Sequence, residues 1–507
     1  TAANTAANNV PGAMVFANTC GNCNPRWADT KYHDVGPRIG FAYNPKGGRL
    51  VIRGGYGVIY SPLQYTDFGG SQVQGFSATP VFNSPDNFSP AFNWDSGFPA
   101  FTPAPITDPS VVNKGNPNYI QPRFGQPGII QSWSFQVQGQ VSKDMVATVG
   151  YVGQRSQNLR SSLMSWNNIP YSDLALGTLL NQPLRTNAAG LQAPYANFYN
   201  DWGTNVSAQQ ALRPFPQYSS FNMDVLQNIG QSTYESLQAT LERRFSAGLS
   251  LQASFTWAKN ITDADSILPG INAGINQVQN PGNLGNEKAL SSQDIPYTFT
   301  TAFLYELPFG RGKPFLNRGV GGAILGGWQI GGVLRYQSGT PISFGCGQGI
   351  PGWDNCIRFN RVPGVSPFST QVLNGTFDPL TDRYFTGVCA YAGQAGCAFA
   401  DPNIERVSQA SNVTVQQTRG GAYIFGDYPR TNGDARSPNY YNEDFSLIRN
   451  FRLVERAMLQ IKAEFLNAPN RHIFSVPNTN PTSANFGVVN GTIDSQRIIQ
   501  FTMRVNF

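Results

Sequence analysis

The stretch at residues 496–507, QRIIQFTMRVNF, is the clearest guide to the fold of this chain. Apolar and polar side chains alternate along it with a period of two, which indicates a β-strand with one apolar and one polar face. In an outer-membrane β-barrel, such a strand meets lipid with one face and lines the lumen with the other. The alternative is a strand of a soluble β-sandwich. The apolar face carries Ile499, Phe501, Met503, Val505 and Phe507, and the polar face carries Gln500, Thr502, Arg504 and Asn506.

The same pattern predicts ten further strands upstream of the terminal one. In 233–245, two leucines four residues apart also fit a helix, but the strict alternation after the turn at 246–248 favours a hairpin of two strands. The predicted strands are 38–44, 49–60, 131–141, 145–153, 233–245, 249–257, 297–307, 328–344, 441–452 and 456–466.

Short and long connections alternate between these strands. Outer-membrane barrels sort their connections in this way, into short periplasmic turns and long extracellular loops, whereas a soluble sandwich has no reason to do so. In this register the C-terminus lies on the periplasmic side. The short turns are 45–48, 142–144, 246–248, 308–327 and 453–455; residues 1–35, 61–130, 154–232, 259–296 and 345–437 are expected to be loops.

The count of eleven strands is odd, whereas bacterial single-chain barrels have an even number, and a barrel in lipid leaves no edge unpaired. We therefore expect residues 1–507 to be the C-terminal part of a longer antiparallel transmembrane β-barrel. No signal peptide is visible in the opening TAANTAANNV, so we expect either that it has been removed or that the chain is a fragment.

The composition agrees with a barrel and argues against a nucleic-acid partner. Charged residues make up 13% of the 507 residues and aromatic residues 12%; charged residues typically make up about 25%. The net charge of +6 is spread without the block of Lys and Arg that a nucleic-acid site needs. No apolar run is long enough for a membrane helix, and barrel strands do not stand out in hydropathy averages.

The six cysteines fall into three pairs that are close in sequence and lie in predicted extracellular segments. This pattern favours disulfides in an oxidising compartment. The competing interpretation of the first pair is a redox or zinc half-site, for which His33 is the one further ligand nearby. The pairs are Cys20/Cys23, Cys346/Cys356 and Cys389/Cys397.

Several strands and short turns resemble the Oar-like TonB-dependent outer-membrane receptors. The resemblance covers nearly the whole chain and is specific to the group, not to a substrate. It implies a barrel of twenty-two strands, of which this chain would supply the second half. The motifs are RIGFAY at 38–43, RGGYG at 53–57, QSWSF at 131–135, STYESLQ at 232–238, LYELPFG at 304–310, WQI at 328–330, SGTP at 338–341, FLN at 465–467 and the final Phe507.

The resemblance also implies partners: the lipid bilayer of the outer membrane, the barrel-assembly machinery, an unidentified solute, and the TonB complex. The TonB contact would be made through an N-terminal plug and TonB-contacting segment that the given residues do not include. The expected signal for assembly lies in the terminal strand, on Phe501, Met503, Val505 and Phe507.

Other candidate sites are few, and we expect neither an enzyme nor a cofactor or metal site. The only histidines, His33 and His472, have no nucleophile motif beside them and are interpreted as loop residues. Asp263 and Asp265 could offer oxygen atoms to Ca²⁺, but solvated carboxylates are the preferred interpretation. The turn GRGK at 310–313 lacks the spacing of a phosphate-binding loop and is interpreted as a periplasmic turn with cations near lipid headgroups.

Four charged residues fall on the predicted lumen face of the strands. They would contact a plug or line a solute path, or they would pair with one another across neighbouring strands. The four are Glu242, Lys462, Glu464 and Arg504.

Two functions are carried forward. The first is a receptor or transporter barrel that moves a bulky solute across the outer membrane and binds it with the loops 61–130, 154–232 and 345–437. The second is a structural or adhesive barrel whose loops contact other proteins. A passive porin is disfavoured because loops of this size should obstruct the mouth, and a soluble all-β secreted protein is the remaining competitor in fold.

Overall fold

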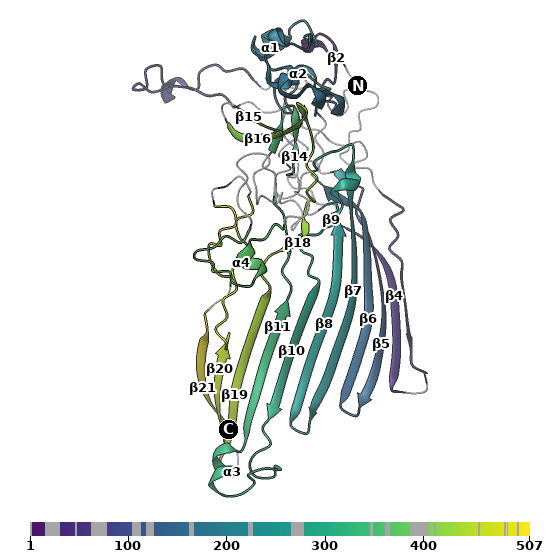
Figure 1. Ribbon diagram of the computed structural model, residues 1–507, viewed down its shortest axis with the longest axis vertical. Coiled ribbons are helices and arrows are strands. Elements are labelled where there is room, and N and C mark those ends of the chain that lie inside the picture. Colours follow the sequence, from purple (N-terminus) through teal and green to yellow (C-terminus); the bar gives the residue numbers. More distant parts are fainter. Residues whose placement is uncertain are drawn as a thin grey trace.

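The largest unit of the computed structural model is an antiparallel sheet that stands upright in Figure 1. It has 12 strands, of which β9 (Ala289–Leu290) pairs with β8 off the main path and the other eleven follow one another in sequence order. The structure describes residues 3–15, 31–45, 48–61, 79–103, 113–117, 126–161, 167–221, 227–264, 278–344, 348–359, 366–385, 405–409, 412–454, 457–480, 483, 485–493 and 496–507.

The eleven strands confirm the predicted all-β antiparallel arrangement and its strand count. Each inner strand on the path pairs with the strand before it and the strand after it, and the sheet is open, with β3 and β21 at its two edges. The strands are β3 (Arg38–Tyr43), β4 (Leu50–Tyr60), β5 (Ile129–Ser142), β6 (Met145–Ser161), β7 (Gln227–Ser246), β8 (Leu249–Thr262), β10 (Tyr297–Glu306), β11 (Trp328–Gln337), β19 (Tyr440–Val454), β20 (Ala457–Leu466) and β21 (Ile498–Asn506).

The hydrogen-bonded register carries one apolar face and one polar face across the whole sheet. On the terminal strand, Phe501 lies opposite Ala463 and Arg504 lies opposite Gln460, so the predicted alternation continues into β20. Side chains on the apolar face of this sheet are largely exposed, including Phe501 and Met503. A soluble sheet would bury such a face, whereas a membrane barrel presents it to lipid.

Aromatic rings lie over glycines of the neighbouring strand on this apolar face. A Cβ atom added to Gly153 would lie 2.3 Å from Nε1 of Trp133, and one added to Gly332 would lie 2.6 Å from Cε1 of Phe303. The same arrangement joins Gly54 to Phe41. Each glycine therefore makes room for the ring opposite it, and the ring covers backbone that a glycine leaves open.

All long connections leave the upper end of the sheet in Figure 1, and the short turns and the C-terminus lie at the lower end. At the upper end, the described parts of 162–226, 263–296, 338–439 and 467–497 pack on one another together with residues 3–15. We call this assembly the loop layer. It contains β1 (Ala3–Asn4), β2 (Val10–Pro11), β12 (Pro341–Ile342), β13 (Gln348–Ile350), β14 (Trp353–Ile357), β15 (Glu405–Gln409), β16 (Asn412–Arg419), β17 (Ala422–Tyr423), β18 (Asn432–Arg436), α1 (Phe198–Trp202), α2 (Ala208–Ala211), α4 (Thr370–Leu373) and the 3-10 helices η1 (Thr5–Ala7), η4 (Tyr171–Asn181), η5 (Leu184–Thr186) and η6 (Leu284–Glu287).

The apolar core of the described residues lies mainly in the loop layer and not in the barrel wall. Three clusters of buried side chains join loops that are distant in sequence. The wall directs its apolar side chains outward, so the apolar side chains of the loops are buried against one another. Their members are Ile342, Phe344, Phe359, Phe385, Tyr428, Ala435 and Phe486; Ile169, Leu174, Leu180, Ile350, Trp353, Ile357 and Tyr423; and Ala7, Leu184, Tyr195, Phe198, Val206 and Ala208.

Several predicted boundaries were wrong. The strand predicted at 328–344 ends at Gln337, because its apolar continuation, Ile342 and Phe344, belongs to a core cluster of the loop layer. A Cβ atom on Gly339 would lie 1.8 Å from the carbonyl oxygen of Ser437, so the chain leaves the sheet where it passes close to another loop. Residues 1–35 and the long loops were predicted to lack regular structure, but they contain the short strands and helices given above. These elements are too short or too irregular to leave a period that can be read from the sequence.

The turn predicted at 308–327 contains helix α3 (Gly319–Leu325), which sequence periodicity missed because the helix has only 7 residues. Among the described residues, no helix combines the length and apolar character needed to cross a membrane.

Candidate functional site

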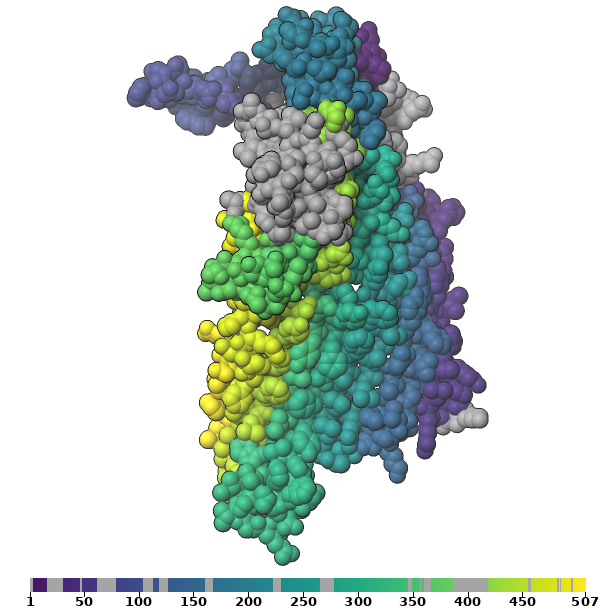
Figure 2. All heavy atoms as spheres, viewed as in Figure 1, coloured from purple at the N-terminus to yellow at the C-terminus, as the bar shows by residue number. Residues whose placement is uncertain are grey.

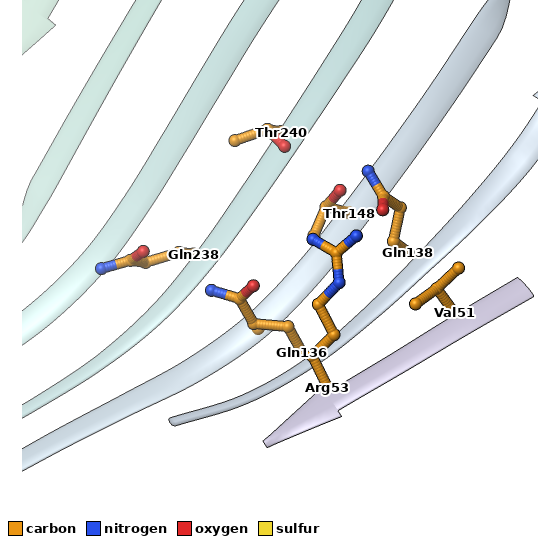
Figure 3. A pocket seen from close by; sticks show the side chains of 8 residues that line it. Val51, Arg53, Gln136, Gln138, Thr148, Gln238 and Thr240 are labelled. Atoms are coloured by element: carbon orange, nitrogen blue, oxygen red, sulfur yellow. The ribbon is translucent and has the colours of Figure 1, made fainter. Parts of the chain in front are cut away.

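A concave site on the polar face of the sheet gathers side chains from four neighbouring strands (Figure 3). It has a volume of about 220 Å³ and spans β4, β5, β6 and β7. Arg53 places a guanidinium group among amide and hydroxyl groups, which can donate to or accept from a polar solute or a polypeptide. The lining residues are Val51, Arg53, Gln136, Gln138, Thr148, Gly150, Gln238 and Thr240.

The antiparallel register explains why these residues meet. Residues that lie opposite each other on adjacent strands share a face, so one row crosses the sheet from Arg53 through Gln136 to Gly150. From Gly150 the row continues to Gln238. A Cβ atom on Gly150 would lie 2.7 Å from Cγ of Gln136, so the glycine leaves space for the Gln136 side chain. The sequence showed the alternation but not this row, because lateral neighbours depend on strand register.

A second row runs beside the first, from Val51 through Gln138 to Thr148 and on to Thr240. The two rows together make a band of hydrogen-bonding groups at one level of the wall. Figure 3 shows the side chains of both rows projecting from the same side of the strands.

The four charged residues predicted for the lumen lie on the same face as these rows, on three strands. Lys462 and Glu464 form an ion pair at 2.6 Å along β20, with about 30% of each side chain exposed. Arg504 lies opposite Gln460 on β21. Glu242 lies opposite Val146 and Gln252, so β8, β10, β11 and β19 separate its strand from β20. The lumen role of these four residues stays a prediction.

The loop layer contains a buried ion pair that the sequence did not reveal. Arg358 donates from Nη1 to Oε2 of Glu287 at 2.6 Å, and the side chains are 8% and 1% exposed. Nε of Arg358 also donates to the carbonyl oxygen of Tyr428 at 2.8 Å. The partners are 71 residues apart in sequence, so no local spacing could have indicated the pair. It joins the loop that follows β8 to the loop that follows β11.

Gln279 strengthens the same junction. Its Oε1 accepts from the backbone N–H groups of Arg358 at 2.7 Å and of Gly426 at 3.2 Å, and its Nε2 donates to the carbonyl oxygen of Gly426 at 2.8 Å. Its own backbone N–H donates to Glu287. One amide side chain therefore satisfies backbone groups of two loop segments in a buried setting, where an unmet hydrogen bond is costly.

A second ion pair attaches the loop layer to the rim of the sheet. Arg436 donates to Oδ2 of Asp294 at 2.7 Å, and Oδ1 of Asp294 accepts from the backbone N–H of Asn260 in β8 at 2.6 Å. Asp294 is 2% exposed at its side chain. The loop that follows β11 is thereby held on the end of β8.

An arm formed by residues 79–103 projects sideways from the loop layer in Figures 1 and 2. Its rings pack on one another, with Phe92 5.2 Å from Phe98 and 5.1 Å from Trp94 between centroids. Phe88 is 95% exposed and Trp94 75%. The backbone N–H of Ser89 donates to Asp86, and this hydrogen bond lowers the pKa of that carboxyl.

The remaining sequence candidates gain little from the structure. Both His33 and His472 lie outside the strands, as expected for loop residues. Burial raises the pKa of Asp263, which accepts from the backbone N–H of Gln231, and Asp265 lies outside the described residues. Within the described residues, no cluster of three or more His, Cys, Asp or Glu side chains could hold a metal ion.

The predicted disulfides also keep the status of predictions. Five cysteines lie outside the described residues: Cys20, Cys23, Cys346, Cys389 and Cys397. Only the backbone of Cys356 is described, in β14.

A family model described as an outer membrane beta barrel domain matches residues 1–500. The chain belongs to this family. Its place is the outer membrane, and the exposed apolar face of the sheet is the face that meets lipid. A comparison with curated proteins finds no match.

Solved structures of transporters and of a receptor are similar to the chain at low sequence identity. The outer membrane transporter YddB from Escherichia coli is 9% identical with a TM-score of 0.38, over 90% of this chain and 38% of that one. The ferripyoverdine receptor of Pseudomonas aeruginosa is 9% identical with a TM-score of 0.35, over 93% and 32%. The FrpB iron transporter from Neisseria meningitidis is 10% identical with a TM-score of 0.32, over 93% and 39%. The chain thus spans between 32% and 39% of the length of these proteins.

Proposed function

We propose that this chain is the C-terminal part of the barrel of an Oar-like TonB-dependent receptor, which moves a bulky solute across the outer membrane. The observation that carries the proposal is the band of amide, hydroxyl and guanidinium groups on the polar face, centred on Arg53, Gln136 and Gln238. Such a band suits a hydrated solute or a plug inside the barrel.

Two further observations support a larger barrel with a covered mouth. The edge strands β3 and β21 each pair with one neighbour, and lipid does not tolerate unpaired strand edges, so we infer that further strands complete the wall. The loop layer is bound together by buried ion pairs and apolar clusters, so it acts as a firm cover. A firm cover suits a receptor that captures one solute more than an open porin.

The test compares what cells remove from a limiting medium. A deletion strain, the wild-type strain and strains carrying Arg53→Gln or Arg244→Gln grow in the same medium, and mass spectrometry follows the depletion of its solutes. Arg244 is an exposed arginine near the turn at the periplasmic end of β7 and serves as the matched control. We expect one solute class to be removed by wild type and by the Arg244 variant, more slowly by the Arg53 variant, and only while the proton-motive force is present.

Equal depletion by the deletion and wild-type strains, under each nutrient limitation tested, would count against transport. Depletion that persists after a protonophore dissipates the proton-motive force would remove the TonB-dependent part of the proposal. The intact mass of the native protein from detergent-extracted outer membranes tests the larger barrel, because a mass near 55.2 kDa leaves no room for further strands.

A second function, an adhesive surface barrel, is favoured by the arm at 79–103. Its aromatic tip is highly exposed at the end of the molecule that carries the long loops, and exposed aromatic patches mark interaction sites. Phe88→Ser leaves the ring cluster of the arm in place and removes its most exposed ring. If adhesion is the function, this variant loses attachment of cells to surfaces or to one another, and solute depletion is unchanged.

A further inference from the structure

The connection between β10 and β11 folds against the lipid-facing side of the wall at its periplasmic end. Trp328 and Arg449 lie opposite each other in the ladder, on the apolar face that also carries Ile330 and Leu447. Nε1 of Trp328 and Nη1 of Arg449 each donate to the carbonyl oxygen of Ile324, both at 2.9 Å. The C-terminal end of α3 is therefore attached to the outer face of the barrel and not to its lumen.

Arg449 is well placed to hold this attachment. It also donates to the carbonyl oxygen of Ala323, and its guanidinium lies 4.3 Å from the ring centroid of Phe451 and 5.4 Å from that of Trp328. A cation at the C-terminus of a helix satisfies carbonyl groups that have no partner within the helix.

The same connection exposes a set of apolar side chains. Val320 is 75% exposed, and the others lie between 46% and 59%. In Figure 2 this segment protrudes at the lower end of the molecule, next to the terminal strand. Because the connection is attached to the lipid-facing side of the wall, these side chains extend the apolar surface of the wall at its periplasmic end. The set consists of Phe315, Leu316, Val320, Ile324 and Leu325.

Two arginines stand beside these apolar side chains. Arg311 and Arg318 line a concave site of about 510 Å³ together with backbone of Gly312, Gly319 and Gly322. Within the part of the chain that the structure describes, neither guanidinium forms an ion pair, whereas Lys313 is paired with Glu306 at 2.8 Å. Guanidinium groups bind phosphate oxygens with two parallel hydrogen bonds, and they are less strongly hydrated than ammonium groups.

Glycines keep the connection compact. A Cβ atom on Gly310 would lie 2.5 Å from Cα of Gly326, so the start and the end of the connection touch backbone to backbone. Gly310 has a φ of +100°, which also favours glycine. This contact holds the two ends of the connection together.

We propose that residues 308–327 form a binding site for an anionic phospholipid of the inner leaflet of the outer membrane. Arg311 and Arg318 hold its phosphate, and Val320, Ile324 and Leu325 contact its acyl chains. The charge of the site, its apolar surroundings and its continuity with the lipid-facing wall all match this one occupant. The proposal does not depend on transport, since it concerns the outer face and not the polar one.

The test measures lipid that stays on the protein. The native protein, purified from outer membranes, is placed in nanodiscs of phosphatidylethanolamine and phosphatidylglycerol and then released into the gas phase for native mass spectrometry. We expect wild type and the control Arg244→Gln to retain phosphatidylglycerol, and R311Q/R318Q to retain at least roughly tenfold less, because each charged hydrogen bond contributes about that factor. R311K/R318K, which keeps the charge, should retain an intermediate amount.

A second variant separates a lipid from free phosphate. V320S/L325S changes two exposed side chains and should also lower the retention of phosphatidylglycerol, since acyl contacts are lost. If this variant retains lipid like wild type, and inorganic phosphate displaces the lipid fully, the site binds phosphate alone and the lipid proposal is wrong. Equal retention by R311Q/R318Q and wild type would also overturn it.

Discussion

Replacing Glu287 by Gln should open the loop layer locally while the barrel wall stays folded. The substitution keeps the shape of the side chain but leaves the Arg358 guanidinium without its carboxylate, 8% exposed and still held by the carbonyl oxygen of Tyr428. Removing one partner of a buried ion pair costs about 3–5 kcal/mol. At about 1.4 kcal/mol per factor of ten, local opening becomes roughly 10²- to 10⁴-fold more frequent.

The matched control is Lys462→Gln. Its ion pair with Glu464 has the same 2.6 Å separation as the pair of Arg358 and Glu287, but about 30% of each side chain is exposed. Exposed ion pairs contribute about 0.2–1 kcal/mol to stability. Lys462→Gln should therefore change the frequency of local opening around β20 by less than roughly a factor of ten. The two variants differ in burial and not in the separation of the charges.

Hydrogen exchange followed by mass spectrometry measures the opening. Peptides that cover 278–290 and 353–359 report on the loop layer, and peptides from β5 to β8 and from β20, the strand that carries Lys462, report on the wall. We expect faster exchange of the loop peptides in the Glu287 variant only. The double variant E287M/R358M should recover part of the protection, because no charge remains buried. Equal exchange in E287Q and K462Q would refute the reasoning that burial sets the strength of these pairs.

Three further predictions follow from particular residues. Gly332→Ala should lower the free energy of unfolding by about 1–3 kcal/mol, because the added Cβ meets the Phe303 ring. The control Gly139→Ala should leave the free energy of unfolding unchanged, because the nearest atom to its Cβ is 4.0 Å away. Urea unfolding in liposomes measures both variants. Burial raises the pKa of Tyr423 to about 12, above an unfolded value of 10.0. The contribution of Tyr423 to stability is therefore complete below pH 10 and is lost as the pH rises toward 12. In Tyr423→Phe, hydrogen exchange of the loop layer should lack this loss of protection between pH 10 and pH 12. Peptide mapping without reductant should recover Cys20 with Cys23, Cys346 with Cys356 and Cys389 with Cys397; recovery as free thiols would contradict the predicted disulfides.

The wall of the barrel was largely predictable from residue periodicity. The predicted strand at 233–245 lies within β7, which runs from Gln227 to Ser246, and its choice over a helix is confirmed. Strand ends were less accurate where side chains stayed alternately apolar beyond the sheet, as between Gln337 and Phe344. Period two reports the two faces of a strand, but it cannot report where a strand stops pairing with its neighbours.

The candidate sites, in contrast to the wall, could be predicted from the sequence only in small part. Polar alternation placed Gln136 and Gln138 on one face, but only strand register showed that they share a concave site with Arg53, Gln238 and Thr240. The cationic turn at 310–313 was visible in the sequence, but its attachment to the outer face depends on Arg449, more than a hundred residues further along the chain.

The sequence by itself determined the barrel wall: eleven strands, their two faces, and short turns at one end with long loops at the other. Local pattern suffices there because each strand pairs with its neighbour in sequence and meets lipid on one side. The tertiary structure alone decided how the loops fold. Glu287 meets Arg358 across 71 residues and Asp294 meets Arg436 across 142, and such contacts follow from three-dimensional packing of irregular segments, which leaves no period in the sequence.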